Sequence, residues 1–265
     1  ACFAAALPVD QELSVRAIIK PSNDPFYTPD EGYERFPVGT ILRSRILNNQ
    51  VGILVFAAKV KTTYQFLVRS EDALGNANAI VTTVFAPFNA DPKKILSFQV
   101  AEDSASLDCS PSYAFQLGAS VDTAITSQIE QAFMYAPLEK GWYVVSPDYE
   151  GPSSAYTVGK QAGKATLNSI RAALASGNYT GISPEAKVAY WGYSGGSSAT
   201  GWAALLEPTY APELKKNTVG YAYGGIIVSI ENTAKKNIGT IFAGLVFAAI
   251  NGLSAQYPEL DAYIK

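Results

Sequence analysis

A serine flanked by glycines is the feature of this sequence that could do chemistry. Gly192, Ser194 and Gly196 form a G-x-S-x-G pattern, with Tyr193 and Gly195 at the variable positions. Such a serine attacks a carbonyl carbon when it sits on a sharp, strained turn, where side chains at the flanking glycines would clash. We therefore predict that Ser194 is a nucleophile. The amide of Gly195 is expected to face the oxyanion that forms on the attacked carbonyl.

The elements expected on either side of the motif strengthen this prediction. Lys187–Gly192 is a short apolar run typical of a strand, and Ser197–Leu206 follows it with helical spacing. A strand, a turn and a helix in this order lift the serine hydroxyl above the carboxyl edge of a sheet. Taken alone, the motif could also be a chance glycine-rich turn.

The rest of the chain predicts the sheet that would carry this turn. Runs rich in β-branched and aromatic residues come first, and strands then alternate with helices. An antiparallel start that feeds a parallel series predicts an α/β-hydrolase fold, a mostly parallel sheet with helices on both faces. The expected strands are Thr40–Leu47, Val51–Val60, Thr63–Val68, Ala79–Ala86, Ile95–Val100, Trp142–Ser146 and Val219–Val228, and the expected helices are Val121–Tyr135 and Gly159–Ala175.

The sequence contains no histidine, which limits what the chain can do by itself. Histidine is the usual general base, so a self-contained Ser-His-Asp triad is excluded, as is a histidine-based zinc site. In this fold the triad acid follows the serine, yet Asp261 is the only aspartate after Ser194. Its surroundings, Tyr257–Tyr263, indicate an exposed helix with a solvated charge. Both the acid and the base are therefore expected beyond Lys265.

Composition and charge exclude several function classes. The 265 residues are 48% hydrophobic and 16% charged with a net charge of −3, and lysine and arginine form no basic stripe. We expect no nucleic-acid partner, no metal and no cofactor. No run of about 20 apolar residues predicts a membrane span. Glycines interrupt the most apolar stretch, Ile238–Leu253, which is predicted to be a buried helix or the lining of an acyl tunnel. The apolar start of the chain is either a signal-peptide remnant or a mature N-terminus.

Two cysteines and one glycosylation sequon bear on the cellular compartment of the protein. Cys2 and Cys109 could bridge each other, pair outside the chain or remain buried thiols, and no CxxC spacing indicates a metal or redox pair. Asn178 begins an Asn-Tyr-Thr glycosylation sequon after an expected helix end.

Asp148 and Glu150 follow the strand Trp142–Ser146 and are two residues apart, so in an extended segment they would share a direction. They could act as an acid and base pair. Hydrogen bonding within the loop is the preferred interpretation, because a serine on this kind of turn needs a histidine partner.

Several separate segments, in order, resemble the secreted fungal lipases typified by Candida antarctica lipase A. The resemblance spans nearly the whole chain and is more specific than the serine motif alone. The segments are Asp24–Tyr27, Pro37–Arg43, Glu102–Asp103, Cys109–Tyr113, Val144–Gly151, Gly192–Gly196 and Tyr210–Leu214.

The resemblance implies a hydrolase core over residues 1–228 and the start of a helical cap over residues 229–265. It implies a secreted enzyme that hydrolyses acyl esters, including triacylglycerols, at a lipid interface or in solution. By position, Ser194 is the nucleophile, and Asp103 joins Gly195 in the oxyanion hole. An ionised Asp103 would repel the oxyanion, so the residue must offer its backbone N–H or carry a protonated side chain. Cys109 matches a family cysteine whose disulfide partner lies downstream of this chain.

The family keeps its catalytic Asp and His in a C-terminal third that this chain lacks. A second polypeptide from the same precursor could supply that portion, the sequence could be truncated, or the chain could be a non-catalytic relative. The first explanation is preferred, because a lone fragment would expose an apolar cap segment and an unfinished sheet. The sequence therefore predicts a serine carboxylic-ester hydrolase that is active only with its C-terminal portion. The alternative is an inactive binding protein or fragment on a hydrolase scaffold.

Overall fold

Seven strands form a mixed sheet at the centre of the molecule. The computed structural model describes residues 18–53, 56–120 and 127–265. The strands lie in the order β1-β4-β5-β7-β6-β8-β9. Their bounds are β1 (Ile41–Ile46), β4 (Thr62–Glu71), β5 (Ala77–Ala86), β6 (Lys94–Gln99), β7 (Tyr143–Pro147), β8 (Lys187–Tyr193) and β9 (Thr218–Gly224).

The sheet is antiparallel at its start and parallel where the serine motif lies. β1, β4, β5 and β7 pair antiparallel, whereas β7, β6, β8 and β9 pair parallel, as the sequence predicts. Gln99 at the end of β6 is paired with Gly192 near the end of β8. The loops that leave these two strands therefore begin side by side at the carboxyl edge of the sheet.

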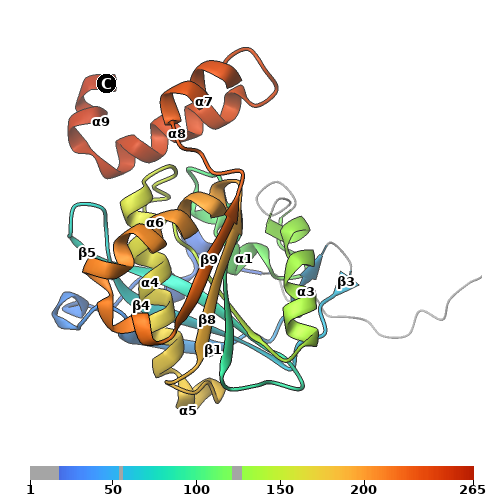
Figure 1. Cartoon of the computed structure of the whole chain (residues 1–265). Coiled ribbons are helices and arrows are strands. Elements are labelled where there is room, and N and C mark those ends of the chain that lie inside the picture. Colours follow the sequence, from blue (N-terminus) through green and yellow to red (C-terminus); the bar gives the residue numbers. More distant parts are fainter. Residues whose placement is uncertain (1–17, 54–55, 121–126) are drawn as a thin grey trace, which may run out of the picture.

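Helices cover both faces of the sheet (Figure 1). On one face, α4 (Gly159–Ala175) and α6 (Gly195–Tyr210) pack over a core that includes Leu167, Ile170 and Val188. On the other face, α1 (Pro111–Ala114) and α3 (Ala132–Glu139) pack with a second core that includes Phe115, Met134 and Leu138. The remaining short elements are α5 (Gly177–Thr180), the β2–β3 ribbon (Gly52–Ile53 and Phe56–Ala57) and the 3-10 turns η1 (Pro21–Asn23), η2 (Pro25–Tyr27), η3 (Tyr33–Arg35), η4 (Leu107–Cys109) and η5 (Pro212–Lys216).

Three C-terminal helices, α7 (Ile230–Asn237), α8 (Ala243–Gln256) and α9 (Pro258–Ile264), lie beyond the carboxyl edge of the sheet (Figure 1). The buried residues of α8 are Gly252 and Gln256, which are one turn apart and so share a face. A Cβ atom at Gly252 would lie 2.4 Å from the backbone nitrogen of Tyr156, and the Gln256 amide donates to Asp72 Oδ2 at 3.1 Å. This face docks α8 on the core. Among the described residues, no helix has the length and apolar character to cross a membrane.

The structure differs from the sequence-based expectation in three segments, which are Val51–Val60, Val219–Val228 and Ile238–Leu253. Val51–Val60 contains the two short strands β2 and β3 rather than one strand, and β9 ends at Gly224 rather than at Val228. Part of the expected helix Val121–Tyr135 lies outside the described residues. The expectation that Ile238–Leu253 is a buried helix is wrong. Most of its large apolar side chains are exposed, Phe247 by 68%, because only the Gly252 face of α8 meets the core.

Candidate active site

Ser194 lies on a strained turn between β8 and α6. Its φ of 53° and ψ of −123° are a conformation that side-chain-bearing residues adopt only when their surroundings impose it. The Ser194 N–H donates to the Gly224 carbonyl on β9 at 3.0 Å, and the Ser197 N–H donates to the Ser194 carbonyl at 3.0 Å. The half-buried Ser194 is thus held between the sheet and the first turn of α6.

Close packing of α6 against the sheet requires the two flanking glycines. A Cβ atom at Gly192 would lie 2.3 Å from the Gly196 carbonyl oxygen, and a Cβ atom at Gly196 would lie 1.9 Å from the Gln99 carbonyl oxygen. In addition, the Thr200 hydroxyl donates to the Gln99 side chain at 2.8 Å. The start of α6 therefore lies directly against the ends of β8 and β6. Only glycine fits at positions 192 and 196, where these contacts are made.

Asp103 meets Gly195 beside the serine, although the two residues are far apart in the sequence. A Cβ atom at Gly195 would lie 1.7 Å from Asp103 Oδ1, so the carboxyl occupies the space that a side chain at position 195 would need. Asp103 has a φ of 48°, a second positive value at this site. Its Oδ1 atom is buried and has no hydrogen-bond partner among the described residues. Burial raises the pKa of Asp103 to about 6.

The side chain of Asp103 lies between Gly195 and a buried glutamate. The Asp103 carboxyl faces Gly195, and burial followed by the Asp103 charge raises the pKa of Glu150 well above its usual range. If Asp103 acts on an oxyanion, the position of its carboxyl against Gly195 favours the protonated side chain as the donor. The raised pKa of Asp103 supports the same choice, because it extends the pH range in which the carboxyl keeps its proton.

Asp148 and Glu150 serve different parts of the molecule. The strand β7 ends at Pro147, and the chain then turns. Asp148 accepts the Ser112 N–H at 2.7 Å and so holds the start of α1, while burial raises the pKa of Asp148 to about 7. Asp148 therefore has a structural hydrogen bond, but its donor lies in α1 and not, as predicted, within the loop. Glu150 is 2% exposed, and its carboxyl oxygens have no hydrogen-bond partner among the described residues, so no hydrogen bond joins the two carboxyls.

A group of buried carboxyls lies behind the oxyanion loop. Glu102 and Glu150 are 8% and 2% exposed, and three of their four carboxyl oxygens are buried without a hydrogen-bond partner among the described residues. Burial, followed by the neighbouring negative charges, raises the pKa of both residues well above the usual range. Nothing in the sequence singled out Glu102 except that it precedes Asp103. No local pattern indicates that Glu102, Asp103 and Glu150 meet.

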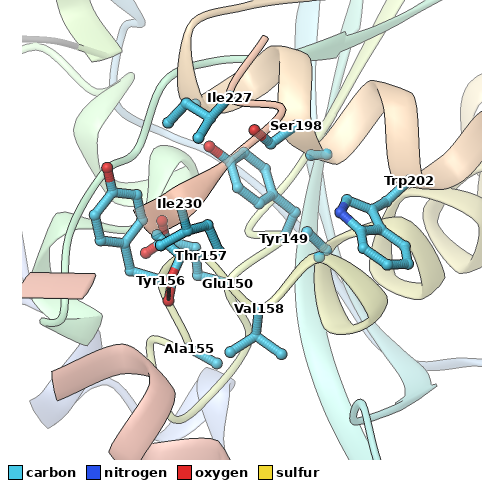
Figure 2. A pocket seen from close by; sticks show the side chains of 14 residues that line it. Tyr149, Glu150, Ala155, Tyr156, Thr157, Val158, Ser198, Trp202, Ile227 and Ile230 are labelled. Carbon is cyan, nitrogen blue, oxygen red and sulfur yellow. Dashed lines mark hydrogen bonds between the residues drawn. The ribbon is translucent and has the colours of Figure 1, made fainter. Parts of the chain in front are cut away.

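A small cavity opens beside Gly195 and continues toward the C-terminal helices. Its volume is about 50 Å³, and Figure 2 shows Tyr149, Glu150, Tyr156 and Trp202 among its lining side chains. A second cavity of about 60 Å³ extends between α7 and α8. Both cavities are lined by Tyr156, Thr157, Ile227 and Ile230. Sequence reasoning did not identify these lining residues, because Tyr156, Thr157 and Ile227 lie in loops without periodicity and Ile230 only begins a short helix.

The remaining predicted residues are Cys109, Asn178 and Asp261. Cys109 is half-buried and has no disulfide partner among the described residues, which do not include Cys2. Asn178 is exposed in α5, and α5 lies at the opposite end of the sheet from α7, α8 and α9 (Figure 1). Asp261 forms an exposed ion pair with Lys265 at 2.7 Å, in agreement with a solvated charge.

Comparison with known proteins gives the family. The secretory lipase family model matches residues 115–265. The chain belongs to the secretory lipase family. Lipase 1 of Candida albicans is 56% identical over 239 residues, which are 90% of this chain and 51% of that lipase. Lipase A of Arthroderma benhamiae is 45% identical over 97% of this chain and 55% of its own length.

A solved structure supports the fold of this secretory lipase chain. The closed state of Candida antarctica lipase A matches with a TM-score of 0.82 and 35% identity, covering 94% of this chain and 56% of that one. The fold is that of the α/β-hydrolases, with a mixed sheet between helices. The chain spans about half the length of the relatives that it matches.

Proposed function

We propose that this chain is the nucleophile-bearing part of a secreted serine carboxylic-ester hydrolase of the lipase type. The observation that carries the proposal is the meeting of Ser194 and Gly195 with Asp103 at one point of the sheet edge. A strained serine supplies a nucleophile for acyl transfer from an ester, and a helix-start amide with a buried carboxyl of raised pKa supplies donors for the oxyanion.

The chemistry follows from these positions. Ser194 Oγ attacks the ester carbonyl carbon while a histidine takes the hydroxyl proton. The carbonyl oxygen becomes negatively charged and accepts hydrogen bonds from the Gly195 N–H and from the O–H of the neutral Asp103 carboxyl. The histidine then protonates the leaving alcohol, and water releases the acid by the reverse steps. Each donor faces charge that develops only in the transition state, so it accelerates the reaction rather than merely binding the ester.

The histidine and the triad acid must come from a C-terminal portion. The chain has no histidine, and its one aspartate after Ser194 is an exposed residue of α9. That portion could be joined to this chain or be a second polypeptide of the same precursor. It would also contain the disulfide partner of Cys109. In this proposal residues 1–228 form the core and residues 229–265 begin the cap.

An acyl chain is the substrate group that best fits the surroundings of the serine. The two cavities that share Tyr156, Thr157, Ile227 and Ile230 lead from Gly195 to the apolar sides of α7 and α8. A hydrocarbon chain gains free energy in such a channel in proportion to the apolar area that leaves water. We therefore propose fatty acyl esters, including triacylglycerols, as the substrate class. The secretory character of the family and the exposed Asn178 sequon support an extracellular enzyme.

A fluorophosphonate probe tests the nucleophile directly. The protein that carries this chain with its C-terminal portion is treated with the probe, and intact mass spectrometry counts the adducts. We expect one adduct, on Ser194, that is lost in Ser194→Ala and kept in the matched control Ser198→Ala. Ser198 is a suitable control because it also lines the cavity beside Gly195.

The outcomes separate an enzyme from an inactive scaffold. Labelling of Ser194 together with hydrolysis of triolein supports the lipase. Labelling with hydrolysis of short esters only supports an esterase. If the protein with its C-terminal portion takes no probe, the chain is a fragment of, or a binding protein on, a hydrolase scaffold.

A further inference from the structure

Trp202 lies at one end of the cavity beside Gly195 and has no part in the proposed reaction. Figure 2 shows its indole on the opposite side of this cavity from Tyr156 and Thr157. Tyr156 and Thr157 also line the second cavity, between α7 and α8, whereas Trp202 lines only the first of the two. One end of the cavity therefore continues toward the C-terminal helices, and the other end stops at Trp202.

The end at Trp202 lies between α4 and α6 and is narrow. Buried alanines line the cavity from both helices, Ala162 one turn from Gly159 on α4 and Ala199 one turn from Trp202 on α6. The whole cavity has a volume of about 50 Å³, roughly one third of the about 150 Å³ that holds a benzene molecule. The end at Trp202 can therefore take a group of about one or two carbon atoms but not an aromatic ring.

Two glycines of α4 fix the position of Trp202. A Cβ atom at Gly159 would lie 1.8 Å from Trp202 Nε1, and a Cβ atom at Gly163 would lie 2.7 Å from the Trp202 carbonyl carbon. Gly159 and Gly163 are one turn apart and share a face of α4, so α6 packs closely on this face. Because the contacts are this tight, the indole cannot move toward α4 to make room for a larger group.

We propose that Trp202 is a specificity-determining residue, which limits the size of a branch on the acyl carbon next to the ester carbonyl. The cavity begins at Gly195, whose amide is the expected oxyanion donor, so its short end lies beside the first carbons of the acyl group. The main acyl chain follows the other end toward α7 and α8. This role rests on the proposed function, since it matters only if an acyl ester binds at Ser194.

Three p-nitrophenyl esters test the role in the protein that has its C-terminal portion. Their acyl groups are butyryl, 2-methylbutyryl and 2-phenylbutyryl, so the branch grows from none to one carbon to a ring. We expect the wild type to accept the first two and to discriminate against the third. Trp202→Ala should raise kcat/KM for the 2-phenylbutyryl ester, relative to the butyryl ester, by at least about 10-fold, since apolar pockets discriminate by about this factor or more for a single methylene.

The readout is a gain of activity, which a loss of folded protein cannot imitate. Trp202→Phe keeps an aromatic ring and should give a smaller gain, so it decides the question if W202A does not fold. Leu206→Ala is the matched control. Leu206 Cδ1 would lie 2.9 Å from a Cβ atom at Gly163, so this residue belongs to the same helix contact, but it does not line the cavity. L206A should leave the ratio of the two kcat/KM values unchanged.

The outcomes separate this role from the proposed function. An unchanged ratio in the Trp202 variants, or an equal gain in L206A, would remove the role of Trp202 while the hydrolase stands. Butyrate esters of ethanol and 1-phenylethanol provide a second comparison. If W202A favours the bulkier alcohol but not the branched acyl group, the cavity receives the alcohol and the proposal is wrong. A wild-type protein that takes no probe at Ser194 and hydrolyses no p-nitrophenyl butyrate would remove the proposed function, and this role with it.

Discussion

The substitution Gly195→Ala separates catalysis from folding at this site. An alanine Cβ would lie 1.7 Å from Asp103 Oδ1, whereas real Cβ contacts are not found under about 3.0 Å. The carboxyl must therefore retreat by more than about 1 Å. The clashing atom is the end of a side chain, so the fold can adapt. Gly196→Ala instead meets the backbone carbonyl of Gln99 at 1.9 Å, which cannot move without displacing β6.

The expected loss in Gly195→Ala follows from the displacement. A catalytic group moved by about 1 Å costs on the order of 10²-fold in rate, and complete loss of one oxyanion donor costs about 10²- to 10³-fold. We expect kcat for ester hydrolysis to fall by about 10²-fold, with a near-normal Tm. Gly196→Ala should fail to give a folded protein. Gly244→Ala is the control, because nothing lies within 4 Å of a Cβ atom at Gly244.

A double-mutant cycle decides whether the mechanism of the loss is correct. Asp103→Ala alone should also lower kcat by about 10²- to 10³-fold, because the donor is gone. In that background Gly195→Ala has no carboxyl to displace, so it should add little further loss. Residues in contact show such non-additive effects, whereas independent sites add. If the two losses multiply, the alanine at position 195 acts by another route and the reasoning fails.

Three further predictions concern pH and the docking of α8. Because the protonated Asp103 is the expected donor, kcat should fall as pH rises through about 6, and Asp103→Asn should remove this limb of the pH–rate profile; an unchanged limb contradicts the assignment. The pKa of Asp148 is raised to about 7, so between about pH 4 and pH 7 the folded state keeps a proton that the unfolded state releases. The free energy of unfolding should fall over this range in urea titrations, and less steeply in Asp148→Asn; equal slopes in the two proteins would exclude Asp148 as the cause. Gly252→Leu should displace α8 from Tyr156 and lower hydrolysis of long-chain esters more than of short ones, while Gly244→Leu should not; equal effects on both ester lengths would argue against an acyl channel at α8.

Much of the framework could be predicted because its signals are local. The helix over Gly159–Ala175 has the expected bounds, and the parallel strands lie where short apolar runs alternate with helices. The G-x-S-x-G pattern predicts the strained turn at Ser194 because all of its signal lies within five consecutive residues. The two glycines leave room for the close backbone contacts that the turn makes. The misjudged segment Ile238–Leu253 shows the limit of this reasoning. An apolar helix of that composition can be buried or exposed, and only its neighbours decide which.

The sequence by itself determined the strand–turn–helix around Ser194 and the absence of a base within the chain. Both follow from residue types and spacing along one segment. Only the tertiary structure decided that Asp148 holds α1 while Glu150 is buried without a hydrogen-bond partner among the described residues, although these two carboxyls are two residues apart. It also decided that the Asp103 carboxyl lies against Gly195, which depends on the pairing of β6 with β8. Periodicity reports which side of an element is apolar. It carries no information on which distant loops meet, because that depends on strand order and register across the whole sheet.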